Sequence, residues 1–585
     1  MQLPLIPYPQ RCTLLDVYVN ISEYTPVILQ LPQSEERLVR MAGRLFKHVE
    51  VRTGEYALFA AHSFAQKYPF GREEGYLLCV RGEEIWLAAG DARGLFYGMQ
   101  TLKQWFEMPE RPALEICDWP ELSLRSDYLD MRGIYPKFPN LLLYVEEMAR
   151  YKLNTLVIEY EDKLPRSRSQ LCARTDCLTK EQHEQLLQTA YENFIDVIPL
   201  QQTFGHLEYV LKQPEYMHLR ATSKKPGELC PLRKGSFEVV AELMEETARM
   251  HPDSRYLHLG CDEVWSLGQS PECKESGKSR QQLAIDFINR LAEKALELGK
   301  IPMIWHDMLL GEIVENKRTL GDLEILSQLN KSIVVAVWLY YPRGVGEVAP
   351  VLIDRLHSLG IQTLPCCAVR ASDNRVNQNY PRIEMRLRNI DMWCDFIADS
   401  RVTGMINTNW CSTFALGNPY GLFETSRYTG FYAAERCWNL RSCTEDFMER
   451  FMAVYHGVYD AKITTGAERR YDYYEIVGTF MPRITRNRQT ALLIKTMFEW
   501  EGACHANALV FRSKLYPGSE VELACLRERA EQCENGRREP ERILKELLPE
   551  LVSPAMAELF FESRTYPNSL FQREIDGLLK GKVSG

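Results

Sequence analysis

The sequence predicts an α/β protein built on a (β/α)8 TIM barrel, with a small α/β domain before it and a helical region after it. Between about residues 120 and 420, short apolar runs rich in β-formers alternate with amphipathic helical stretches. There are eight such runs, which is the number that closes a barrel. A doubly wound sheet is the structural alternative, but no GxGxxG motif follows the first run, so the barrel is favoured.

The domain before the barrel is predicted over residues 1–118 and carries no evident catalytic group. It combines helices at SEERLVRMAGRLFKHV (34–49) and DARGLFYGMQTLKQWF (91–106) with strands at EGYLLCV (74–80) and EEIWLAA (83–89).

The barrel itself is predicted over residues 119–430. Its eight strands are SDYLDM (126–131), NTLVIEY (154–160), FIDVIPLQQ (194–202), YLHLGC (256–261), IPMIWHD (301–307), SIVVAVWLY (332–340), IQTLPCCAV (361–369) and VTGMINTNW (402–410). The helices between them carry apolar residues three and four apart, as in LLLYVEEMARYKL (141–153), SFEVVAELMEETARM (236–250), QQLAIDFINRLAEKALELG (281–299) and RIEMRLRNIDMWCDFIA (382–398).

The region after the barrel, residues 431–585, is helical and charged. ERAEQCENGRREPERILKELLPEL (528–551) mixes acids and bases, which is typical of a solvated helix face. We assign it no chemistry.

The composition is that of a soluble globular protein, with 45% hydrophobic and 25% charged residues and a net charge of −9. No Lys/Arg block favours a nucleic acid or an anionic membrane as partner, and the run SIVVAVWLYY is too short to span a bilayer. The N-terminus lacks the pattern of a secretory signal. The 17 scattered cysteines favour free or buried thiols in the cytoplasm, and neither they nor the 11 histidines suggest a metal or another cofactor. The sequence does not indicate an oligomeric state.

Barrel chemistry lies at the carboxyl ends of the strands, and here those ends alternate carboxylates with aromatic side chains. Aromatic planes stack on the C–H faces of a sugar, while acids and amides bond its hydroxyls. Any one of the tryptophans taken alone fits the core equally well. Three tryptophans at one rim favour a sugar site. The residues at the carboxyl ends of the eight strands are Asp130 and Arg132, Glu159 to Asp162, Gln201 to His206, Asp262 and Glu263, Trp305 to Asp307, Trp338 to Tyr341, Arg370, and Asn407 to Trp410.

The fourth strand ends in two adjacent acids, Asp262 and Glu263, within LHLGCDEV (257–264). This stretch resembles the fourth-strand motif of glycoside hydrolase family 20, the β-N-acetylhexosaminidases, usually His-x-Gly-Gly-Asp-Glu, and Cys261 resembles the hexosaminidase D branch. The stretches LVIEYEDKLP (156–165) and VIPLQQTFGHLEYVLKQPEYMHLR (197–220) fit the same branch. The resemblance covers roughly the first 430 residues.

The resemblance implies an exo-β-N-acetylhexosaminidase that removes terminal β-linked GlcNAc or GalNAc from glycans or glycoconjugates with retention. Adjacent carboxylates cannot flank a sugar ring as the pair about 5 Å apart in an ordinary retaining glycosidase does. In this family the substrate's own 2-acetamido oxygen attacks C1 and forms an oxazolinium-type intermediate. Glu263 then acts as acid and base, and Asp262 accepts the acetamide N–H. We expect a negative Asp262 to raise the pKa of Glu263.

The same resemblance implies the residues that bind the sugar. Trp305, Trp338 and Trp410 are expected to wall the acetamido pocket, and His206 to lie near the acids, although a purely structural buried histidine is the alternative. Three family positions differ here. Arg132, or else Lys137, replaces an arginine that normally stands one residue later; Tyr340, or else Tyr341, replaces a missing seventh-strand tyrosine; and Ser412 stands where an acid is usual. Asp162 completes the predicted substrate-binding set. These differences leave the choice between GlcNAc and GalNAc open.

Two other functions remain open from the sequence. A two-carboxylate retaining β-glycosidase would use Glu263 as acid/base and Asp307 or Glu161 as nucleophile, with no need for a 2-acetamido group. A catalytically silent sugar-binding barrel would be marked by the loss of Asp262 or Glu263, and both are present.

Overall fold

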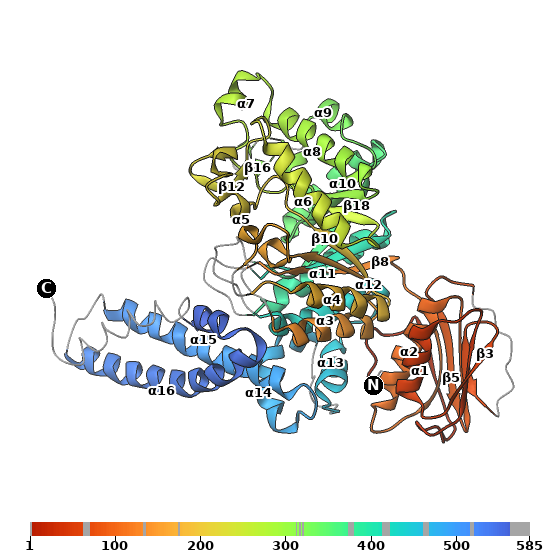
Figure 1. The fold of residues 1–585 in the computed structure, drawn as a ribbon. Helices are drawn as coiled ribbons and strands as arrows, with labels where there is room; N and C mark the ends of the chain where they lie inside the picture. Colours follow the sequence, from red (N-terminus) through yellow and green to blue (C-terminus); the bar gives the residue numbers. More distant parts are fainter. Residues whose placement is uncertain are drawn as a thin grey trace.

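The computed structural model describes residues 3–61, 71–132, 136–173, 176–311, 313–314, 317–318, 321–371, 380–411, 422–459, 467–514 and 520–561. Figure 1 shows three parts: a sheet domain at the N-terminus, a central barrel, and a pair of long C-terminal helices that extend away from the barrel.

The central part is a closed barrel of eight parallel strands, in the order in which they follow one another along the chain. This confirms the predicted barrel. The strands are β8 (Leu124–Asp130), β9 (Thr155–Glu159), β10 (Asp196–Leu200), β13 (Tyr256–His258), β14 (Ile301–Trp305), β17 (Val334–Trp338), β18 (Gln362–Arg370) and β19 (Gly404–Asn409).

A helix follows each strand, as a barrel of this kind requires. The helices are α3 (Phe138–Arg150), α4 (Lys180–Glu192), α6 (Ser236–Met250), α8 (Arg280–Glu297), the five-residue α9 (Leu323–Ser327), α10 (Ala349–Ser358), α11 (Ile383–Ala398) and α12 (Arg427–Trp438). Short elements also decorate the connections, among them α5 (Glu208–Leu211), β11 (Arg220–Thr222), β12 (Lys225–Leu229), α7 (Pro271–Glu275), β15 (Ile313–Val314) and β16 (Lys317–Arg318).

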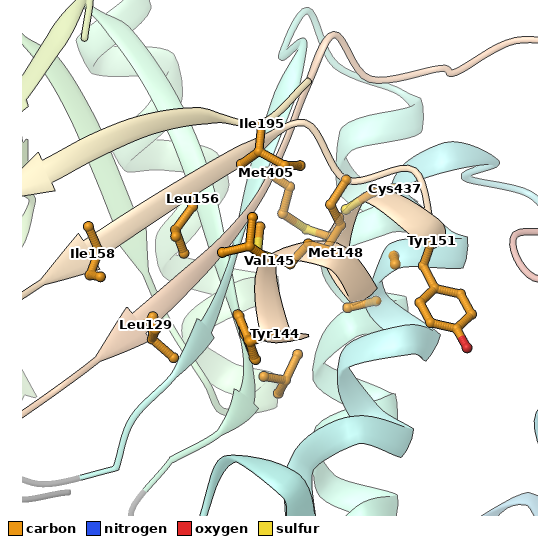
Figure 2. Close-up of a cluster of buried hydrophobic side chains, with 14 of the residues drawn as sticks. Leu129, Tyr144, Val145, Met148, Tyr151, Leu156, Ile158, Ile195, Met405 and Cys437 are labelled. Atoms are coloured by element: carbon orange, nitrogen blue, oxygen red, sulfur yellow. The ribbon is translucent and has the colours of Figure 1, made fainter. Parts of the chain in front are cut away.

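Side chains alternate between the inside and the outside of the barrel, as they do along any strand. Tyr128, Val157 and Met303 belong to the apolar cluster that fills the interior. Leu129 and Leu156 lie on the other face, beside Val145 and Met148 of α3 (Figure 2). Each such aliphatic side chain contributes about 1.5–3 kcal/mol when fully buried, so this layer fixes the helices on the barrel.

The N-terminal domain is a seven-stranded sheet in the order β1-β7-β5-β6-β4-β2-β3, with α1 and α2 on one face (Figure 1). The prediction found both helices but only two of the seven strands, those that the structure has at Tyr76–Arg81 and Glu84–Ala89. The elements are β1 (Arg11–Leu15), β2 (Val27–Leu31), α1 (Glu36–Leu45), β3 (Val49–Thr53), β4 (Ala57–Ala60), β5 (Tyr76–Arg81), β6 (Glu84–Ala89), α2 (Ala92–Phe106) and β7 (Ala113–Asp118).

The C-terminal region is helical, as predicted. It consists of α13 (Phe447–His456), α14 (Tyr473–Phe480), α15 (Arg488–Lys514) and α16 (Glu520–Leu551). Helices α15 and α16 pack along each other (Figure 1). The end of α16 returns to the barrel, where Leu551 O accepts the N–H of Lys137 at 2.8 Å and Val552 bridges to Pro136. Within the described part of the chain, no helix is both long enough and apolar enough to cross a membrane.

Several buried histidines are held neutral by the fold. His456 on α13 contacts the hydroxyl of Tyr473 at 2.9 Å, and burial lowers the pKa of His456 to about 3. Burial likewise lowers the pKa of His183 to about 4 and that of His251 to about 3, where the two rings meet at 3.2 Å. In the unfolded chain the pKa of histidine is about 6.5, so unfolding in mild acid takes up protons.

We expect this proton uptake to destabilise the fold as the pH decreases from 7 to 5. A single histidine with a folded-state pKa near 3 costs about 2 kcal/mol over that interval, because only the unfolded form is protonated there. His456→Gln removes one such group, so its melting temperature should fall less than that of the wild type between the two pH values. The exposed His48→Gln is the control. Equal shifts for wild type and His456→Gln would contradict the prediction.

Candidate active site

The two acids lie on a turn after β13 whose backbone is left-handed at three positions. Gly260, Cys261 and Glu263 have φ of 65°, 68° and 56°. A residue with a Cβ adopts this region at a cost, which proteins tolerate mainly where the surrounding structure enforces it and function requires it. The turn therefore needs specific contacts to hold it.

One of these contacts is a close approach to the loop after β10. A Cβ added at Gly205 would lie 2.0 Å from the carbonyl oxygen of Asp262. Glycine is thus required at this position, directly before His206, because any side chain would push the acidic turn away.

We expect Gly205→Ala to lower kcat/KM by about 100-fold, since displacements of an ångström at a catalytic group have effects of that size. The measurement is turnover of an aryl glycoside of the N-acetyl sugar that the sequence resemblance implies as substrate, with circular dichroism to show that the fold is retained. Gly430→Ala on α12 is the matched control, because nothing lies within 4 Å of the added methyl group. Activity of Gly205→Ala within a few-fold of the wild type would show that the acidic turn tolerates the shift.

His206 lies between the two acids. Its Nε2 is 3.2 Å from Oδ2 of Asp262 and 3.4 Å from Oε2 of Glu263. Burial alone would lower the pKa of His206, but the Asp262 carboxylate outweighs burial and raises the pKa well above its usual value. Burial in turn would raise the pKa of Asp262, and His206 holds it below its usual value. At neutral pH the site therefore contains an imidazolium ion beside an Asp262 carboxylate.

The acids differ in their exposure. The side chain of Glu263 is 30% exposed, whereas that of Asp262 is 6% exposed. Glu263 is thus accessible to a leaving group at the mouth of the barrel, and Asp262 lies below it. The backbone N–H of Glu263 donates to Oδ2 of Asp307 at 2.9 Å.

A second charged cluster occupies the neighbouring strands β8 and β9. The Arg132 guanidinium is 2.9 Å from Oδ1 of Asp130 and 3.5 Å from Oε1 of Glu159. Glu159 also accepts from Nε2 of Gln202 at 3.1 Å and from the hydroxyl of Tyr128. Burial raises the pKa of Glu159, and the charge of Arg132 opposes this. Arg132 is therefore fixed directly after the carboxyl end of β8.

Aromatic side chains line the adjoining part of the barrel. Trp305 is fully buried, with its ring centroid 4.3 Å from that of His258 and 5.7 Å from that of Trp410. Trp410 donates through Nε1 to the hydroxyl of Tyr340 at 2.7 Å, and Tyr340 stacks on Trp338 at 5.6 Å. The three predicted tryptophans thus form one continuous wall with Tyr340.

The structure brings most of the predicted residues into these groups. Asp262, Glu263 and His206 meet directly, Arg132 lies 5.5 Å from the centroid of the Trp410 ring, and Tyr340 bonds Trp410. Lys137 instead directly precedes α3, where its side chain makes no capping hydrogen bond, and Tyr341 is 51% exposed. Ser412 lies outside the described residues.

Asp162 is the predicted residue for which the structure offers least support. It lies in a 3-10 turn, Glu161–Lys163, and its carboxylate pairs with the neighbouring Lys163. Among the described residues, no hydrogen bond or ion pair joins it to the acidic turn. Glu159, three positions earlier in the same predicted strand end, lies in the charged cluster instead and was left out of the predicted substrate-binding set. Strand alternation was the signal, because the inward-facing Val157 puts Glu159 inside the barrel.

A closed (β/α)8 barrel whose carboxyl-terminal face carries adjacent acids beside a tryptophan wall belongs to the class of barrel glycoside hydrolases. The glycosyl hydrolase family 20 catalytic domain matches residues 124–349, and domain 2 of the same family matches residues 2–119. The two matches together span more than half of the chain, and the chain belongs to glycosyl hydrolase family 20.

Individual relatives agree with this assignment. The chain is 27% identical over 297 residues to hexosaminidase D of Bos taurus, a match that spans 49% of this chain and 84% of that protein. It is 28% identical over 299 residues to hexosaminidase D of Homo sapiens, spanning 49% of this chain and 60% of that protein. The solved structure of Flavobacterium johnsoniae chitobiase is similar in fold, with a TM-score of 0.61 at 17% identity, covering 100% of this chain and 95% of that one.

Proposed function

We propose that the protein is an exo-acting β-N-acetylhexosaminidase that releases terminal β-linked N-acetylhexosamine with retention, using the substrate's 2-acetamido group as nucleophile. Membership of family 20 and the hexosaminidase relatives support the activity. The observation that carries the mechanism is the acid pair itself. Asp262 and Glu263 are adjacent in the chain and both contact one nitrogen of His206, which supports a mechanism in which the two carboxylates do not flank the sugar from opposite sides.

In the proposed reaction each residue has a separate task. The acetamido oxygen attacks C1 while the more exposed Glu263 protonates the departing glycosidic oxygen, and Glu263 then takes a proton from the water that opens the oxazolinium-type intermediate. The buried Asp262 accepts the acetamide N–H and stabilises the positive charge that develops on that group. His206, held as a cation by Asp262, keeps both carboxylates in place.

The wall of Trp305, Trp338 and Trp410 supports the proposed selectivity for an N-acetyl sugar. A pocket with aromatic sides favours the acetamido methyl group, and a glucoside would leave that volume empty and Asp262 without its donor. Tyr340 carries a hydroxyl beside this wall, which suits the acetamido oxygen.

The two-carboxylate alternative has weaker support. Burial raises the pKa of Glu161 well above its usual value, which disfavours the charged carboxylate that a nucleophile needs. Asp307 is engaged with the backbone N–H of Glu263. Neither observation favours a second catalytic carboxylate across the sugar.

The test is hydrolysis of chromogenic β-GlcNAc, β-GalNAc and β-glucoside substrates, with a thiazoline analogue of the cyclic intermediate as inhibitor. We expect turnover of the N-acetyl sugars alone, blocked by the thiazoline. Equal turnover of the glucoside would overturn substrate assistance. No turnover of any of the three substrates would favour a binding function. The same panel ranks GlcNAc against GalNAc.

We also propose that the enzyme acts in the cytoplasm on glycans or glycoconjugates that end in N-acetylhexosamine. The support for this compartment is the large number of scattered cysteines in the sequence, which suits a reducing environment. Fractionation of cells of the source organism, followed by detection of the protein with an antibody, tests it.

A further inference from the structure

The end of β14 contacts the acidic turn at both of its ends. The N–H of Trp305 donates to the carbonyl oxygen of Gly260 at 2.9 Å. Two residues later, Oδ2 of Asp307 accepts the N–H of Glu263, also at 2.9 Å. Asp307 is itself 3% exposed and begins a short 3-10 turn, Asp307–Leu309. One segment of three residues thus holds the turn that presents the acids.

The contact from Asp307 falls on the position where the turn most needs support. Glu263 has a left-handed backbone, which is unfavourable for any residue with a Cβ. The Asp307 carboxyl oxygen accepts this N–H inside the protein, and the low local dielectric around the buried Asp307 strengthens such a bond. Without this acceptor the peptide would relax toward an ordinary backbone conformation, and the Glu263 side chain would point elsewhere.

Other contacts of the turn are made to groups other than the N–H of Glu263. His206 binds the two side-chain carboxylates, and Gly205 makes room for the carbonyl of Asp262. The thiol of Cys261 lies 3.3 Å from the hydroxyl of Thr203. The carbonyl of Glu263 accepts the N–H of Trp265 at 3.0 Å, whereas Asp307 accepts the N–H of Glu263, the proposed general acid.

We propose that Asp307 is a positioning residue for Glu263, acting through the backbone of the catalytic acid and not on the sugar. The inference rests on the proposed function, in which Glu263 protonates the leaving group. It gives Asp307 a role that differs from that of a nucleophile: the carboxylate needs only an oxygen that accepts an N–H. An asparagine in its place retains such an oxygen, and an alanine does not.

The leaving group of the substrate distinguishes this role from general structural support. The value of kcat/KM reports the steps up to departure of the leaving group. Phenoxide departs slowly without a proton, whereas 2,4-dinitrophenoxide departs readily without one. We expect Asp307→Ala to lower kcat/KM for phenyl β-GlcNAc by about 100-fold and for the 2,4-dinitrophenyl substrate by less than about 5-fold. Asp307→Asn should stay within about 5-fold of the wild type on both.

Asp322→Ala is the matched control, because Asp322 also accepts backbone N–H groups, those of Glu324 and Ile325 at the start of α9. It should leave both kcat/KM values unchanged. Melting temperatures show whether each variant folds.

Three results would overturn the inference: equal losses on the two substrates in folded Asp307→Ala, a folded Asp307→Asn as inactive as the alanine variant, or covalent labelling of Asp307 by a 2-fluoro glycoside. Failure of the proposed function is a separate result, since wild type would then show no preference for N-acetyl sugars.

Discussion

Glu263→Gln is expected to lower kcat/KM by about 10²–10⁴-fold on aryl N-acetylhexosaminides whose leaving group requires a proton. Glutamine has the shape of the glutamate but cannot donate a proton from a carboxyl group, so departure of the leaving group loses its acid. The loss should shrink as the pKa of the leaving phenol falls, because a good leaving group departs unassisted. A series of substituted phenyl β-GlcNAc substrates measures this dependence.

The second half of the reaction offers an independent check on the same variant. Water needs a base to open the cyclic intermediate, whereas azide attacks without one. Added azide should therefore raise the turnover of Glu263→Gln on 2,4-dinitrophenyl β-GlcNAc and give the β-glycosyl azide. Glu238→Gln, on the exposed first turn of α6, is the control and should behave as the wild type. A uniform loss across the phenol series, with no effect of azide, would remove Glu263 from the role of acid and base.

The sequence predicted the barrel well because each strand is a β-rich apolar run that ends in polar or aromatic residues. The rim residues follow from this, since carboxyl ends of parallel strands meet at one face. Within the run from Glu159 to Asp162 the prediction chose Asp162, and the alternation of β9 was the information it did not use. Val157 faces the interior, so Glu159 does too, and Asp162 lies beyond the strand, where the alternation no longer applies.

The details of the acidic turn depend on contacts that are distant in sequence. Its left-handed residues Cys261 and Glu263 carry no local signal for that conformation, because only glycine adopts it freely. Gly205 and Asp307, which accommodate and hold the turn, are 57 and 44 residues away from the residues they contact, as the pairs Gly205–Asp262 and Glu263–Asp307 show. Such support becomes visible only when the strands are placed side by side.

The charges of the site are arranged in two groups with different tasks. Arg132 compensates Asp130 and Glu159 at the carboxyl ends of β8 and β9, and this group is buried. His206 compensates Asp262 and reaches Glu263, which is open to solvent. Removing one partner of a buried ion pair is strongly destabilising, because it leaves an uncompensated charge inside the protein. Loss of either partner should therefore perturb the remaining charge as well as the chemistry.

Asp262→Asn follows from this coupling and is expected to lower kcat/KM by about 10²–10³-fold, since it removes the charge that faces the developing oxazolinium ion. It also removes the main anion that faces the buried His206. Burial then weighs more, and the pKa of His206 should fall from its raised value, since Glu263 alone is left to oppose burial. NMR of the histidine ring nitrogens measures this change directly, and binding of the thiazoline should weaken in parallel.

Asp127→Asn is the control for the same substitution at another buried site. Asp127 lies on the outer face of β8, where it bonds Tyr144 and Asn407, and burial raises its pKa to about 6. This variant should retain turnover, thiazoline affinity and a cationic His206. In the wild type the Asp262–His206 pair stabilises the fold between the lowered pKa of the acid and the raised pKa of the histidine, and this contribution is lost as the pH moves beyond either value.

Full thiazoline affinity in Asp262→Asn would show that Asp262 does not contact the acetamide, because an asparagine cannot supply the missing charge.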